Sequence, residues 1–244
     1  MRWINNSIAT VAALAVACVT AVSARTSEPP EGREFEFAVR ELVFSGLAGD
    51  VESLERALEL CSRALAEDPE NAEALVWHGS TSMALAGVAY QNGDLHVGGA
   101  LWQRALEEMD RAVELAPDDV AVLIPRAATL LGAARNAPFP AQARSLTQTA
   151  VADYEKVYDI QRPYFDRMTE HARGELLLGL ADGRHRLGDH EVATGYLRQI
   201  AELLPGSPYA REAEAYLAGG ADMTMLSFRS CQGCHEGEIP ASDP

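Results

Sequence analysis

Apolar residues recur at helical spacing from Phe35 to about Gly219, with polar residues between them. This stretch is rich in Ala and Leu and holds no run of alternating β-branched residues, so the pattern predicts helices and no strands. The periodicity stops at Gly219-Gly220, where the composition shifts. We therefore expect one all-α region over residues 35–219, followed by a segment of a different kind over residues 220–244.

One spacing of small and bulky positions occurs three times in the helical region. A small residue is followed four positions later by a second apolar residue, three later by a third, and five later by proline. The copies are Ala57-x3-Cys61-x2-Ala64-x4-Pro69, Ala105-x3-Met109-x2-Ala112-x4-Pro117 and Ala193-x3-Leu197-x2-Ile200-x4-Pro205. This pattern resembles the second helix of a tetratricopeptide (TPR) repeat, which ends at a proline.

The resemblance implies an irregular TPR-like solenoid of about four helical hairpins, with Pro208–Leu217 as a final capping helix. Stacked hairpins build a continuous core and a concave inner surface, so we expect a protein partner in the groove. Two places depart from the repeat. The stretch from Gly79 to Ala105 is about 14 residues too long for a 34-residue unit, and we expect a longer helix plus a loop there. The third repeat, residues 120–163, is degenerate.

Residues 1–24 have the pattern of a secretory signal peptide. Arg2 precedes an apolar run over residues 8–22, and Val22-Ser23-Ala24 is a small-residue cleavage site. We expect an exported, periplasmic protein whose residues 25–34 form a polar linker. Two alternatives stay open, namely an uncleaved N-terminal anchor and lipidation at Cys18.

The segment 220–244 contains Cys231-Gln232-Gly233-Cys234-His235. This C-x-x-C-H sequence resembles the haem-attachment motif of c-type cytochromes. The resemblance implies haem c bound covalently through Cys231 and Cys234, with His235 as the proximal axial ligand. The function so implied is electron transfer by an exported monohaem protein. In the alternatives the same residues form a redox dithiol or a zinc site on a periplasmic TPR adaptor.

The sixth ligand of such a haem has no candidate after the motif, because none of the nine residues beyond His235 is Met or His. An upstream Met, an upstream His, another chain or an open site remain. We expect a weak or absent protein ligand, with Met225 as the best single candidate. His78 and His185 lie in predicted helices and are expected at the surface or in the groove. No pair of histidines has the spacing of a dedicated site.

The net charge is −16, and removal of Arg2 with the leader leaves 36 acidic against 19 basic residues, or −17. This balance argues against nucleic acid or an anionic membrane as partner and favours a basic partner surface. Lys156 is the only lysine, which we interpret as compositional bias. Cys61 occupies a packing position and is expected to be a buried structural thiol. No Ser-His-Asp order, catalytic carboxylate pair or phosphate loop is evident, so no enzyme is expected.

Overall fold

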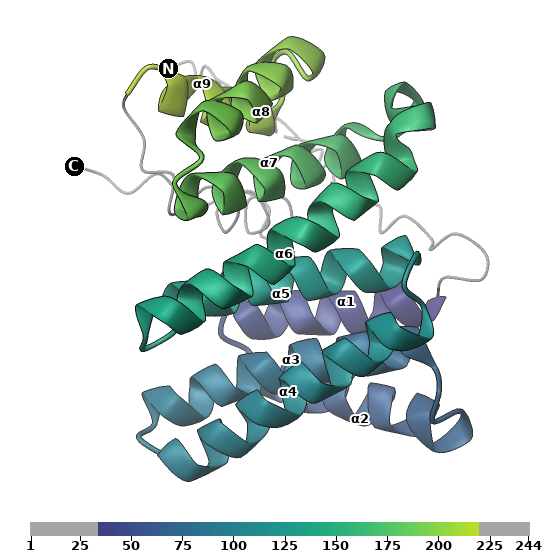
Figure 1. The fold of residues 1–244 in the computed structure, drawn as a ribbon. Helices are drawn as coiled ribbons and strands as arrows, with labels where there is room; N and C mark the ends of the chain where they lie inside the picture. Colours follow the sequence, from purple (N-terminus) through teal and green to yellow (C-terminus); the bar gives the residue numbers. More distant parts are fainter. Residues whose placement is uncertain (1–33, 220–244) are drawn as a thin grey trace, which may run out of the picture.

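The computed structural model describes residues 34–219, which form four helical hairpins and a final helix (Figure 1). No strand occurs in this part of the chain. The all-α, TPR-like prediction is therefore confirmed. The elements in order are α1 (Glu34–Leu47), α2 (Val51–Glu67), α3 (Ala72–Gln91), α4 (Leu95–Leu115), α5 (Val120–Asn136), α6 (Pro140–Gln161), the 3-10 helix η1 (Arg162–Arg167), α7 (Glu170–Leu187), α8 (His190–Leu203) and α9 (Pro208–Leu217).

The hairpins stack so that each one buries its apolar face against the next. The first helices α1, α3, α5 and α7 contact one another in sequence, and α2, α4 and α6 each also contact the first helix of the following hairpin. In Figure 1 the turns within hairpins lie at the left edge and the connections between hairpins at the right edge. The helix α9 packs on α8, where it covers the end of the stack.

Short polar residues set the helix boundaries. Asp50, Asn71, Asp94 and Asp119 are N-caps whose side chains each accept a hydrogen bond from a backbone N–H of the first turn. At the other end of α7, Gly188 adopts a left-handed conformation with φ +94°, which a residue with a Cβ rarely adopts. This glycine allows the chain to reverse within two residues into α8.

The repeated spacing found in the sequence marks the core of each hairpin. Its first two positions are at most 1% exposed in α2, α4 and α8, where they are Ala57 and Cys61, Ala105 and Met109, and Ala193 and Leu197. The third hairpin uses the same spacing: Ala150, Tyr154 and Val157 of α6 are buried. The sequence conceals this copy because its proline, Pro163, comes one residue late.

The extra residues of the second hairpin lengthen both of its helices. Helix α3 has 20 residues and α4 has 21, and only residues 92–94 separate them. The expected longer helix is therefore present, and the loop between Gly79 and Ala105 is limited to residues 92–94. Asp94 caps α4 at Leu95, and a Cβ on Gly98 would lie 2.6 Å from the Tyr90 ring. Gly98 thus serves close helix packing and does not mark a loop.

Candidate functional site

The residues predicted from the motif, Cys231, Cys234, His235 and Met225, lie outside the described residues, as do the signal peptide and residues 25–33 of the linker. The haem prediction therefore stays a prediction. Within residues 34–219, no group of three or more His, Cys, Asp or Glu side chains is arranged to hold a metal ion. In the same range no helix combines the length and the apolar character needed to cross a bilayer.

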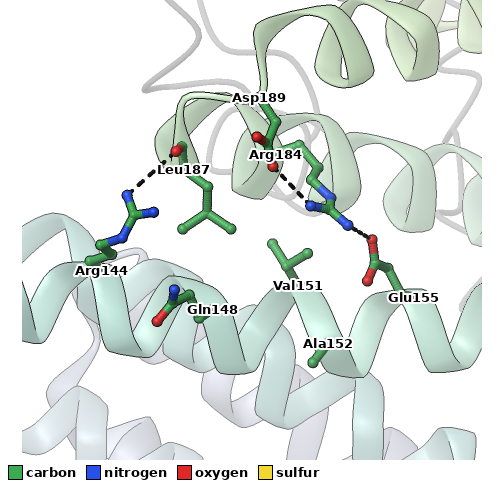
Figure 2. A pocket seen from close by; sticks show the side chains of 8 residues that line it. All are labelled: Arg144, Gln148, Val151, Ala152, Glu155, Arg184, Leu187 and Asp189. Atoms are coloured by element: carbon green, nitrogen blue, oxygen red, sulfur yellow. Dashed lines mark hydrogen bonds and ion pairs between the residues drawn. The ribbon is translucent and has the colours of Figure 1, made fainter.

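A surface cleft of about 300 Å³ lies where the third hairpin meets the fourth (Figure 2). One wall is a face of α6, and the other is the end of α7 with the turn into α8. The lining residues are Arg144, Gln148, Val151, Ala152, Glu155, Arg184, Leu187 and Asp189. The cleft is therefore formed by both kinds of helix: α6 is the second helix of its hairpin, and α7 is the first helix of the next one.

Charged side chains of both signs surround the cleft. Arg184 pairs with Glu155 on α6 and, at 2.8 Å, with Asp189 at the start of α8. The hydrogen bond to Glu155 raises the pKa of Arg184 most, and the hydrogen bond to Asp189 raises it further. Arg144 is exposed and donates a 3.4 Å bond to the Leu187 carbonyl. The cleft therefore offers polar groups at its rim and the apolar side chains of Val151, Ala152 and Leu187 between them, as Figure 2 shows.

A buried arginine–carboxylate cluster also stabilises the contact between the third and fourth hairpins. The Asp182 side chain of α7 is fully buried, accepts two bonds from Arg186 at 2.7 and 2.8 Å, and pairs with Arg135 of α5 at 2.8 Å. Arg186 in turn donates to the Leu131 carbonyl at 3.1 Å. The charges are thus satisfied in place, which a buried ion needs, and they fix α7 against α5.

A second arginine–carboxylate cluster lies at the contact between the second and third hairpins. Arg126 of α5 makes a bidentate pair with Asp153 of α6, with both distances 2.7 Å, and a third bond to Asp110 of α4 at 2.9 Å. A planar guanidinium suits this fork geometry, and a lysine could not reproduce it. The excess of arginine over lysine therefore has a structural use in the buried clusters, at Arg126, Arg135 and Arg186, which the interpretation as compositional bias did not consider.

His78 links the first two hairpins. Its Nδ1 lies 2.6 Å from Glu108 Oε2, and its Nε2 lies 3.3 Å from the Oγ of Ser62 on α2. The carboxylate accepts a bond, which assigns the Nδ1–H tautomer. His78 is 2% exposed, so the expectation of a surface or groove position is wrong. Glu108 and Ser62 let α3 bury this polar ring because they satisfy both of its nitrogens.

Ser62 contacts the imidazole of His78, which in turn contacts the carboxylate of Glu108. Serine hydrolases use the same sequence of contacts in their catalytic triad. Ser62, however, lies inside α2, where the backbone N–H groups are engaged in helical bonds. That helix therefore supplies no donors for an oxyanion, which acyl transfer requires. We interpret Ser62, His78 and Glu108 as a structural link between α2, α3 and α4.

Cys61 behaves as predicted. Its side chain is fully buried in α2, and burial, together with the nearby charge of Glu108, raises the pKa of the thiol to about 12. A thiol in this environment is neither a nucleophile nor a ready metal ligand, since both roles need the thiolate.

Comparison with known proteins supports the fold. No protein-family model matches the chain, and no curated protein matches it. The chain is similar to the crystal structure of a thermophilic TPR protein from Thermus thermophilus, with a TM-score of 0.51 and 21% sequence identity. The match covers 81% of this chain and 90% of that one. At this identity the likeness shows a TPR-like fold.

Proposed function

We propose that the protein is an exported helical-repeat protein that docks a protein partner and transfers electrons through haem c attached at Cys231 and Cys234. Two independent observations support it. The TPR-like stack of hairpins with an open cleft supports the docking, and the C-x-x-C-H sequence together with a signal-peptide pattern supports the haem. Haem c attachment takes place outside the cytoplasm, so an exported chain and the motif agree.

The docking proposal rests on the cleft between α6 and the α7–α8 turn. Solenoids of stacked hairpins present extended surfaces to partners, and this cleft has charged groups at its rim with apolar side chains between them. The chain carries a net charge of −16, which favours a partner with a basic surface and speeds the encounter. A protein partner fits this combination better than nucleic acid does.

Site-specific photo-crosslinking in the cell envelope tests the docking. A photoreactive amino acid replaces Gln148, which is exposed in the cleft on α6, or, as the matched control, Gln103, which is exposed on α4. We expect one discrete protein adduct from position 148 and none from position 103. The same adduct from both positions, or from neither, would contradict docking in this cleft.

The haem proposal assigns Cys231 and Cys234 to the two thioether bonds and His235 to the proximal position. Haem supplies one-electron transfer, and the axial ligands set its potential. We propose a weakly ligated or open sixth position, with Met225, six residues before Cys231, as the best single candidate for a protein ligand.

A pyridine haemochrome assay tests the attachment. The protein is matured with the haem-attachment machinery, and the spectrum of two thioether bonds is expected for the native chain. Cys231→Ala and Cys234→Ala should each lower haem retention, and His235→Ala should lower it more. Cys61→Ala is the matched control, since Cys61 is buried in α2 and should leave haem content unchanged. Equal haem in all variants, or a colourless native protein, would favour the adaptor alternative with a thiol-redox or zinc site.

A further inference from the structure

Two imidazole rings meet at the turn between α7 and α8. His185 belongs to the last turn of α7, and His190 is the first residue of α8. The Nδ1 atoms of the two rings are 3.1 Å apart, and the ring planes are inclined by 60°. The left-handed Gly188 brings them together. The spacing of five residues does not place two side chains on one face of a helix, so the sequence conceals this pair.

The separation of the two nitrogens suits a shared metal ion. Zinc binds imidazole nitrogen at about 2.0–2.1 Å, so nitrogens 3.1 Å apart subtend roughly 95° at such an ion. That angle lies between octahedral and tetrahedral values. Rings that both direct Nδ1 at this ion have centroids roughly 4.8 Å apart, and the observed centroid distance is 4.7 Å. A metal can therefore take the place of the contact between the two nitrogens with little movement of either ring.

The surroundings leave room for a cation. The two guanidinium groups of the last turn of α7 are compensated, since Arg184 pairs with Glu155 and Asp189, and Arg186 pairs with Asp182. His190 is exposed, so the ion can enter from solvent and keep bound water. The Tyr216 hydroxyl of α9 lies 3.3 Å from the same Nδ1 of His185 and places an oxygen donor beside the two nitrogens.

We propose that His185 and His190 form a two-histidine site for a divalent transition metal of the zinc, nickel and copper class. Imidazole nitrogen is the ligand that suits these ions. The protein supplies two nitrogens, and water or the Tyr216 hydroxyl completes the coordination. The bound ion joins α7 to α8 across Gly188, so it stabilises the fourth hairpin by binding the folded chain alone. This site does not depend on the haem. It lies on the α7–α8 turn, where the neighbouring residues Arg184, Leu187 and Asp189 line the docking cleft.

Calorimetric titration of the full chain with zinc chloride, after chelator treatment, tests the site. His190→Gln should remove one equivalent of bound zinc. His96→Gln, which changes an exposed histidine in the first turn of α4, should remove none. Zinc should also raise the melting temperature of the native chain and of His96→Gln, but raise it less for His190→Gln.

Because His190 is exposed, its variant is expected to fold, and the melting curve without zinc verifies this. His185→Gln is the second variant and should lose the same equivalent. Equal zinc stoichiometry in the native chain and His190→Gln would overturn the proposal, as would the absence of zinc binding to the native chain. Any zinc held by Cys231 and Cys234 remains in every variant, so it does not mimic the loss.

Discussion

At the scale of single residues, the sequence predicted apolar positions better than polar ones. Cys61 follows the repeat spacing and is buried as expected. His78 lies in the interior of the same hairpins, and its burial depends on Ser62, 16 residues before it, and on Glu108, 30 residues after it. Such partners come from other helices, so neither periodicity nor local spacing can reveal them.

The link between His78 and Glu108 should contribute measurably to stability. Glu108→Ala leaves the Nδ1–H of a buried imidazole without its acceptor, and we expect a loss of about 2 kcal/mol in the free energy of unfolding. Glu107→Ala is the matched control, because Glu107 is exposed and contacts Gln103 on its own helix. Chemical denaturation measures both. A loss for Glu107→Ala as large as that for Glu108→Ala would contradict the assignment.

The same carboxylate predicts an acid dependence. Burial raises the pKa of Glu108, but the hydrogen bonds from His78 and Arg104 outweigh it and hold the pKa below its ordinary value of 4.5. A carboxyl group whose pKa is lower when folded stabilises the protein above its unfolded pKa, and this stability is lost as the pH falls through the folded pKa. Unfolding free energy should therefore fall less steeply below pH 4.5 in Glu108→Ala than in the native chain. Parallel profiles of unfolding free energy against pH for the native chain and Glu108→Ala would contradict this prediction.

Ligation at the sixth position of the proposed haem can be tested directly. If the site is open, carbon monoxide should bind the reduced protein rapidly, and Met225→Ala should bind it at the same rate. Stopped-flow absorbance measures both rates. Slow binding to the native protein with fast binding to the variant would refute the open site and establish Met225 as ligand. Slow binding to both would point to a histidine or to another chain.

At the scale of elements, the sequence predicted helices, hairpins and the capping helix α9, because helix type follows from apolar period. The sequence predicted less accurately where a helix boundary depends on the position of a single residue. In α6 the late Pro163 concealed the repeat spacing, and in the second hairpin the sequence did not show where the loop between Gly79 and Ala105 lies. Gly98 lies against the Tyr90 ring, so there a glycine marks close approach of two helices.

Gly179 of α7 can be used to test whether glycine allows close packing of two helices. A Cβ on Gly179 would lie 2.6 Å from the Tyr154 ring of α6, and Gly179→Ala should therefore destabilise the protein by about 1–3 kcal/mol. The matched control is Gly195→Ala in α8, where a Cβ meets nothing within 4 Å. That change should stabilise by about 0.5–1 kcal/mol, since alanine favours the helix. Denaturation curves with the same sign for both variants would contradict the packing described.

At the scale of the whole molecule, apolar repeats stack the hairpins and arginine clusters fix how they meet. Arg126 bridges the second and third hairpins, and Asp182 and Arg184 bridge the third and fourth. The sequence predicted the stack because each hairpin has its own pattern. It could not predict the cleft of Figure 2, because the cleft depends on how α6 and the α7–α8 turn face each other.

The helical stack should fold without the C-terminal segment. A chain ending at Gly219 retains every packing position of the four hairpins and α9, so we expect a helical circular dichroism spectrum and cooperative melting. A chain ending at Gly206 lacks α9, whose Tyr209 and Ala213 are buried, and should melt at a lower temperature. A disordered spectrum for the chain ending at Gly219 would place residues 220–244 within the core.

The intact mass of the protein isolated from the cell envelope tests the central claim most directly. If the proposal holds, the isolated protein has lost residues 1–24 and gained one haem at Cys231 and Cys234. The account predicts the mass of residues 25–244 plus one haem, with the haem retained after denaturation. The mass of residues 25–244 alone, from cells that attach haem to other proteins, would contradict it.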